Sequence, residues 1–167
     1  MSQSLQNRVA RLVEYASARA LAPELAILVD LSRSSMRRRL WVVDVASGEV
    51  LLSALAASGR GRTLATRVFP RTGDMPDSWL TPEGHCLVAE RYEGEFGVAY
   101  RLDGLDVTNA NVRRRAIVLH ASPDVPECVC SWRPLWCSRG CIVVSPEVFK
   151  KMDALLQKRP SMLWIYS

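Results

Sequence analysis

The sequence predicts a mainly β fold, a single-domain sandwich or barrel with an N-terminal helix and a late C-terminal helix. Apolar runs of strand length, separated by turn signals, fill most of the chain. Helical spacing of apolar residues occurs near the two ends of the chain. Strand and helix patterns do not alternate, which disfavours a doubly wound parallel sheet.

The first predicted element is a helix over residues 4–22, which Pro23 ends. The runs LAILVDLS, RLWVVDVA and EVLLSALAA then have strand composition, and the SGE turn joins the last two into a hairpin over residues 40–54. Residues 59–84 are rich in Gly, Pro, Thr, Arg and Asp and predict a loop with short strands.

The second half continues with two predicted strands, HCLVAERY and GVAYRLDGL, around an EGEFG turn. VTNANVRRR indicates a short helix or turn, and RAIVLHA is a buried strand that leads to His120. After a long loop over residues 122–140, SPEVFKKMDALLQK predicts a helix with Ser145 as N-cap and Pro146 at its first position. SMLWIYS predicts the last strand.

Composition sets limits on function. The 167 residues suit one domain, and no apolar run approaches the roughly 20 residues of a membrane span. The net charge of +5 permits binding to nucleic acid or another anionic polymer. However, basic and aromatic residues are not interleaved as in proteins that stack bases, so we expect no nucleic-acid partner. We interpret the clusters Arg37–Arg39 and Arg113–Arg115 as solvated strand edges.

The N-terminus does not have the pattern of an export signal, because charged residues interrupt its apolar positions. Three explanations remain open. The protein acts in the cytoplasm, a signal has been trimmed, or export follows a route that needs no signal peptide.

Four of the five cysteines gather in residues 128–141, close after His120. One hypothesis is a zinc site, but the spacing C-x-C-x6-C-x3-C lacks two well-separated knuckles, so we expect no metal. A second is a disulfide between Cys128 or Cys130 and Cys137. The third is a nucleophile, with Cys141 activated by His120. Gly140 would allow a sharp turn there, and backbone N–H groups around it would stabilise an oxyanion.

The stretch from IVLHAS to CSRGCIVV resembles the active-site signature of the L,D-transpeptidase (YkuD-type) catalytic domain, a His at a strand end followed by S-x-G-C. RLWVVDVASGEVLLSALAASGRG, GEFGVAYRLDGLD, RRRAIVLHAS and the C-terminal SPEVFKKMDALLQKRPSMLWIYS are similar to segments of its murein L,D-transpeptidase catalytic-domain-like branch. We therefore divide the chain into an N-terminal helical segment, residues 1–24, and a catalytic domain, residues 25–167.

The resemblance implies roles for individual residues. Cys141 matches the nucleophile, His120 the general base, and Gly140 with the Cys141 N–H the oxyanion region. Ser138 matches the motif serine beside them. The chain departs from the family at Ser58, where the branch has a His. Candidates for substrate binding complete the set: Arg139, Arg101, Ser122 and Trp136.

The resemblance also implies a function that needs no cofactor. The expected substrate is the peptidoglycan stem peptide, cleaved between residue 3, commonly diaminopimelate, and D-Ala at position 4 through an acyl-thioester. Cross-linking or hydrolysis would follow. We expect the periplasm or cell envelope as the location. An antibacterial effector is a further possibility, with an immunity protein or a secretion-system carrier as partner. The alternative is a non-catalytic wall-binding or zinc-stabilised interaction domain.

Overall fold

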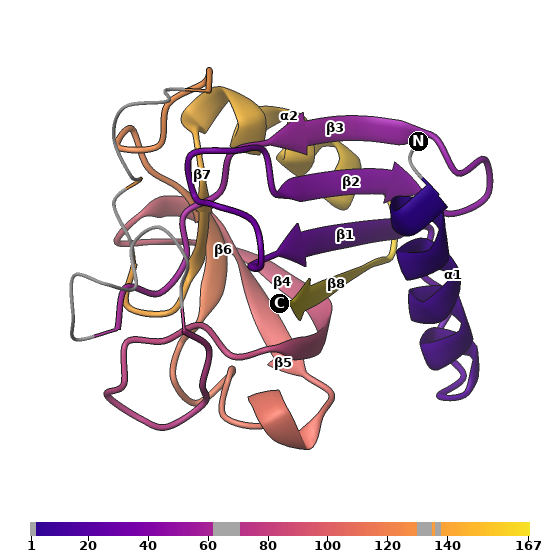
Figure 1. Ribbon diagram of the computed structural model, residues 1–167, viewed down its shortest axis with the longest axis horizontal. Helices are drawn as coiled ribbons and strands as arrows, with labels where there is room; N and C mark the ends of the chain where they lie inside the picture. Colours follow the sequence, from indigo (N-terminus) through magenta and orange to yellow (C-terminus); the bar gives the residue numbers. More distant parts are fainter. Residues whose placement is uncertain (1–2, 62–70, 130–134, 136–137) are drawn as a thin grey trace.

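A single eight-stranded sheet forms the centre of the computed structural model, which describes residues 3–61, 71–129, 135 and 138–167. The strand order is β3-β2-β1-β8-β4-β5-β6-β7 (Figure 1). The strands are β1 Leu25–Asp30, β2 Leu40–Asp44, β3 Val50–Ala54, β4 Gly84–Gly94, β5 Gly97–Gly104, β6 Val118–Ala121, β7 Ile142–Val144 and β8 Ser161–Tyr166. The helices are α1 Gln3–Ser17, the 3-10 helix η2 Val107–Asn109, and α2 Pro146–Leu156.

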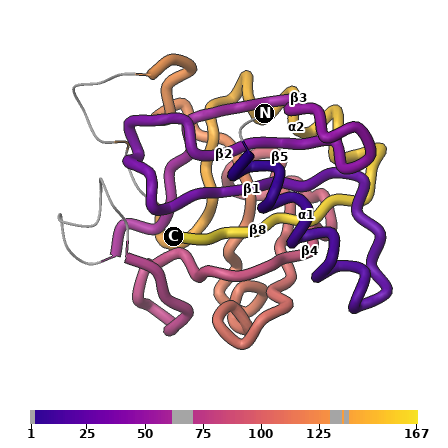
Figure 2. The backbone as a smooth tube through the Cα atoms, turned by 45° about the vertical axis from the view of Figure 1, so that its right-hand side comes forward, coloured from indigo at the N-terminus to yellow at the C-terminus, as the bar shows by residue number. Residues whose placement is uncertain are grey.

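The last strand lies in the middle of the sheet. β8 pairs in parallel with β1 and antiparallel with β4, so the C-terminal strand joins the N-terminal strands to the second half of the chain (Figure 2). β6 and β7 form the other parallel pair. Because β6 and β7 run in the same direction, the residues that begin β7 lie beside the first residues of β6.

The sheet curls far enough for its two edges to meet. The segment after edge strand β3 runs along the other edge strand, β7, where Ala57 and Val143 exchange backbone hydrogen bonds of 2.8 and 3.0 Å. A second bridge joins Gly59 to Ser138. These bridges nearly close the sheet into a barrel and bring residues 57–60 next to the cysteine-rich end of the loop.

Two clusters of buried apolar side chains lie on opposite faces of the sheet. One contains Phe149, Met152 and Leu156 of α2 with inward-facing residues of most strands. The other contains the apolar stripe of α1 and the opposite faces of β1, β2 and β8. Figure 1 shows the two helices at different ends of the sheet. The stripe of α1 consists of Leu5, Val9, Leu12 and Ala16.

The predicted fold class is confirmed, and the departures concern lengths of elements. α1 ends at Ser17, five residues earlier than predicted, and Ala20 beyond it has a φ of 56°. β6 begins at Val118 because Ala116 has a φ of 51°, which a strand residue does not adopt. β7 was not predicted, since three residues are too few to show a period. The predicted N-cap is present, and Ser145 Oγ accepts a 3.3 Å hydrogen bond from Val148 N.

The interpretation of both arginine clusters as solvated edges was wrong for one residue in each. Arg39 is fully buried, and its guanidinium donates to Ala56 O at 2.8 Å and to Ser58 Oγ at 3.0 Å. The Arg115 side chain is 7% exposed and pairs with Asp74. The sequence shows the charge of a run of arginines, but their hydrogen-bond partners come from distant segments.

None of the described helices is long and apolar enough to cross a membrane.

Candidate active site

The parallel pairing of β6 and β7 brings the predicted base and nucleophile to one face of the sheet. His120 is in register with Val143, and Cys141 lies just before β7, beside Val118 if that register is extended. Side chains two residues apart share a face, and strands are about 4.8 Å apart with a rise of about 3.3 Å per residue. The Cα atoms of His120 and Cys141 are therefore about 8 Å apart.

The His120 ring is held in a defined tautomer. Its Nδ1 lies 2.9 Å from Ala121 O, and because a carbonyl only accepts, Nδ1 carries the hydrogen. Nε2 of the neutral ring is therefore the basic nitrogen. The ring stacks on Phe96 with centroids 4.3 Å apart and is 5% exposed. Burial lowers the pKa of His120, although the Ala121 carbonyl favours the charged form.

The Cys141 thiol lies 3.8 Å from Ala116 O, a weak S–H···O contact. Burial raises the pKa of Cys141, while the Val118 N–H and the positive charge of Arg115 act in the opposite direction. Among the contacts of the described residues, none is a hydrogen bond between this thiol and His120. With a raised thiol pKa and a lowered imidazole pKa, the resting pair is neutral, and thiolate forms only on proton transfer.

The turn that precedes β7 is fixed by the Ser138 hydroxyl. Ser138 Oγ donates to Cys141 O at 2.6 Å and accepts from Gly140 N at 3.0 Å. Gly140 has a φ of 131°, and a Cβ there would lie 3.0 Å from Leu80 O. The Gly140 N–H is thus already engaged, which leaves the Cys141 N–H as the candidate oxyanion donor of this turn.

Residues 57–60 support the turn from the other side. Ser58 O accepts from Ser138 N, and Arg60 N donates to Ser138 O, both at 2.9 Å. The Ser58 side chain accepts from buried Arg39. Ser58, where the resemblance predicts a His, therefore belongs to the scaffold that holds Ser138 in this structure.

The predicted substrate-binding residues lie around the turn. The Arg139 guanidinium is 5.2 Å from the centre of the Trp79 ring, and Arg60 is 4.6 Å from the same ring. Arg101 is opposite Val118 on β5, on the face that carries His120, and its guanidinium covers the Tyr92 ring at 4.5 Å.

Ser122 is farther along β6 than His120. Its hydroxyl interacts with Asp124, and its N–H donates to Val144 O at 2.9 Å. Trp136 lies outside the described residues, so its predicted role is untested.

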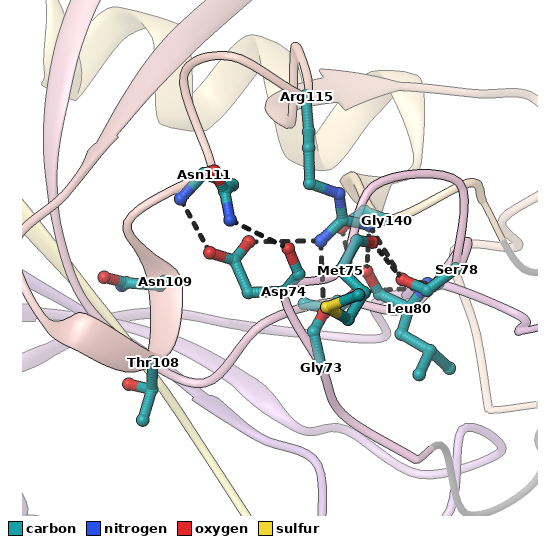
Figure 3. Close-up of polar contacts among 12 residues, drawn as sticks. Gly73, Asp74, Met75, Ser78, Leu80, Thr108, Asn109, Asn111, Arg115 and Gly140 are labelled. Atoms are coloured by element: carbon teal, nitrogen blue, oxygen red, sulfur yellow. Dashed lines mark hydrogen bonds and ion pairs between the residues drawn. The ribbon is translucent and has the colours of Figure 1, made fainter.

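A buried polar network lies behind the turn. Arg115 donates to Leu80 O at 2.7 Å and to Gly73 O at 3.1 Å, and it pairs with Asp74 at 3.2 Å (Figure 3). Asp74 also accepts from Asn111 N at 2.6 Å. The network fixes the loop over residues 73–81 against Gly140.

The other cysteine hypotheses are only partly open to comparison with the structure. Cys130 and Cys137 lie outside the described residues, so neither the zinc site nor the disulfide is tested. Within the described ranges, no group of three or more His, Cys, Asp or Glu side chains could hold a metal ion. Cys128 is exposed, and Cys86 is buried and free.

Sequence reasoning missed the residues that surround the pair. Phe96 was part of a turn signal, although an aromatic residue between two glycines on a hairpin is unusual enough to note. Arg115 was grouped with its charged neighbours, and Asp74 was assigned to a loop. Their interactions join segments about 40 residues apart, for which the sequence gives no local signal.

Comparison with known proteins places the chain in a family. The family model described as L,D-transpeptidase catalytic domain matches residues 1–166, and the chain therefore belongs to this family. No curated protein of similar sequence was found.

Solved structures share the fold, and two of the three described next are L,D-transpeptidases. One from Xylanimonas cellulosilytica is 18% identical, with a TM-score of 0.52 over 93% of this chain and 69% of the other. A cysteine-to-serine mutant of the Enterococcus faecium enzyme is 16% identical, with a TM-score of 0.52 over 86% and 50%. Bd1075 from Bdellovibrio bacteriovorus is 22% identical, with a TM-score of 0.53 over 86% and 48%. The chain spans about half the length of the last two proteins.

Proposed function

We propose that this member of the L,D-transpeptidase catalytic domain family acts on peptidoglycan stem peptides through an acyl-thioester on Cys141. The observation that carries the proposal is the tautomer of His120. Its Nδ1 is committed to Ala121 O, so the basic Nε2 is available on the face that carries Cys141. A buried neutral imidazole beside a thiol is the arrangement that general-base activation of a cysteine requires.

In the first step, His120 Nε2 takes the proton of the Cys141 thiol as the sulfur attacks the carbonyl carbon between diaminopimelate and D-Ala. The thiol must first leave Ala116 O, where its proton now points. The Cys141 N–H faces the developing oxyanion. Collapse of the tetrahedral intermediate breaks the C–N bond, and the imidazolium of His120 returns its proton to the departing amine of D-Ala.

The thioester is resolved by a second nucleophile. The side-chain amine of another stem gives a 3–3 cross-link, water gives the shortened stem of an L,D-carboxypeptidase, and a free D-amino acid gives exchange. In each case His120 takes the proton of the attacking group and Cys141 leaves as the thiol. Burial of the His120 ring keeps bulk water from the base, which favours an amine that binds over water that diffuses in.

Basic residues around the turn suit an acidic stem peptide. Arg139 and Arg60 present two guanidinium groups to the Trp79 ring, and Arg139 directly precedes Gly140. Neither arginine forms an ion pair with another described residue. We assign Arg139 to a stem carboxylate, with Arg101 and Ser122 as further contacts along the same face.

Such a substrate implies action in the cell envelope. We propose the periplasm as the location, either for a resident enzyme or for an effector delivered into competing bacteria. An effector would need a secretion-system carrier, and its producer would need an immunity protein. A coding region for such a protein beside this one would support the effector form, and an export signal in a longer reading frame would contradict it.

The test is incubation with diaminopimelate-containing muropeptides, followed by mass spectrometry of stems and protein. We expect loss of D-Ala, a thioester adduct on Cys141, and loss of both in Cys141→Ala. His120→Ala should lower turnover by roughly 10²–10⁴-fold.

Cys128→Ala is the matched control, because Cys128 is an exposed cysteine with no role in the proposed reaction. D-Ala release that persists in Cys141→Ala would refute the assignment. Bound zinc in stoichiometric amount would instead support an interaction domain.

A further inference from the structure

Arg115 is a charge built into the back of the catalytic turn. Its side chain is 7% exposed, and that of its partner Asp74 is 11% exposed, so water screens their interaction little. Among the described residues, the guanidinium donates to two backbone carbonyls, Gly73 O and Leu80 O, and to two side-chain oxygens, Asp74 Oδ1 and Ser78 Oγ.

This charge is linked to the thiol by two routes. Through the chain, Arg115 directly precedes Ala116, whose carbonyl accepts from Cys141 Sγ. Through space, Arg115 holds Leu80 O, and this carbonyl lies 3.0 Å from the position of a Cβ on Gly140. Figure 3 shows the guanidinium between Asp74 on one side and the carbonyl of Leu80 on the other, with Gly140 next to it.

The backbone between the charge and the thiol is constrained. Ala116 has a φ of 51°, a left-handed conformation that costs about 1–2 kcal/mol for a residue with a side chain. Arg115 N donates to Asn111 O at 2.8 Å, and Asn111 N in turn donates to Asp74 at 2.6 Å. Arg115, Asp74 and the turn are therefore joined by hydrogen bonds that fix where the guanidinium lies relative to the thiol. The Ala116 carbonyl itself favours the protonated thiol, so the charge of Arg115 is what favours the thiolate.

We propose that the buried pair Arg115–Asp74 sets the reactivity of the Cys141 thiol. Arg115 is a positioning residue whose positive charge favours the thiolate, and the negative charge of Asp74 partly cancels that effect. The inference rests on the proposed role of Cys141 as nucleophile. Arg115 would then activate the Cys141 thiol in addition to His120, without itself taking or giving a proton.

Other charges near Cys141 do not replace this pair. Arg139 precedes Cys141 by two residues, but its guanidinium is directed to the Trp79 ring at the surface. Arg101 lies across β6 and covers Tyr92. His120 is neutral at rest, because burial lowers its pKa. Burial raises the pKa of Cys141, and of these groups Arg115 is the one whose charge lowers it.

The experiment measures alkylation of Cys141 by iodoacetamide against pH, resolved by peptide mass spectrometry. Arg115→Met removes the charge at similar length, and we expect alkylation at pH 7.5 to fall about 10-fold, in the range that a neighbouring charge produces. Asp74→Asn keeps a side-chain oxygen for Asn111 but removes the negative charge. It should raise the rate roughly 2–3-fold, less than the first effect because Asp74 lies on the far side of the guanidinium.

Two controls separate electrostatics from folding. Arg115→Lys keeps the charge and loses most of the hydrogen bonds, so its alkylation profile should stay near wild type while its thermal stability falls. Thermal unfolding of Arg115→Met and Asp74→Asn, recorded on the same samples, should show that both variants are folded at the assay temperature. Changes of Cys141 reactivity in the same direction for Arg115→Met and Asp74→Asn would overturn the proposal.

If Arg115→Met does not fold, the Asp74→Asn variant is sufficient as a test. An unchanged or lower rate of Cys141 alkylation in Asp74→Asn would then overturn the proposal. The assay contains no stem peptide, so its outcome is independent of whether the proposed function holds.

Discussion

Phe96 provides the sharpest prediction about the proposed base. It lies in the turn between β4 and β5 and stacks on the His120 ring with centroids 4.3 Å apart and planes 20° apart. Phe96 itself is 52% exposed, whereas His120 is 5% exposed. Because half of the Phe96 side chain stays exposed, its main effect is to shield the His120 ring from water. We predict that Phe96→Ala opens the ring to solvent.

The magnitude follows from the geometry. About half of the Phe96 side chain is buried, which gives about half of the roughly 2–3 kcal/mol for a fully buried phenylalanine. Stacking adds about 0.5–1.5 kcal/mol. A loss of about 2 kcal/mol in the free energy of unfolding lowers the melting temperature by about 4–8 °C for a chain of this size. Phe96→Leu should lose less, and Phe96→Tyr should stay near wild type.

The pH dependence has a definite sign. Burial holds the pKa of His120 below its ordinary value, so the ring is neutral and basic through neutral pH. Exposure raises that pKa toward the ordinary value, and the acid limb of the pH–rate profile then moves to higher pH. NMR titration reads the ring directly, because the chain has two histidines and His85 serves as an internal reference. An unchanged His120 titration in Phe96→Ala would show that the stack does not exclude water.

Three further predictions concern the scaffold. Gly140→Ala should cost about 1–3 kcal/mol and slow alkylation of Cys141, because its φ of 131° is strained and its Cβ meets Leu80 O at 3.0 Å. Gly97→Ala, with a φ of 72° and open space, is the control, and equal effects in calorimetry and alkylation would contradict the steric argument. Arg39→Met leaves buried hydrogen-bond acceptors without their donor and should cost about 2–4 kcal/mol in denaturant titrations; a cost below 1 kcal/mol would refute it. Burial lowers the pKa of His85 despite its contact with Asp106, so His85 binds a proton more tightly in the unfolded state than in the folded state. Stability should therefore fall between pH 7.5 and 5.5 and fall less in His85→Gln, and equal slopes would exclude this histidine as the cause.

Most strands and both α-helices of this protein could be predicted from its sequence. Period-two and buried apolar runs predicted β1 to β6 and β8, with errors of a few residues at their ends. Ser145 and Pro146 marked the start of α2, because capping is a property of neighbouring residues. The fold class and the family were predicted correctly, and the family model matches residues 1–166. The roles of individual site residues stay predictions.

The sequence by itself determined where strands and turns form and which residues belong to the signature, because these depend on side chains close together along the chain. Tertiary structure alone decided that β8 enters between β1 and β4, that Arg39 and Arg115 are buried, and that Ser58 and Arg60 hold the backbone of Ser138. It also decided that Phe96 covers His120. Each of these outcomes depends on burial and on partners far away in the sequence, and a local pattern of residues carries no information about either.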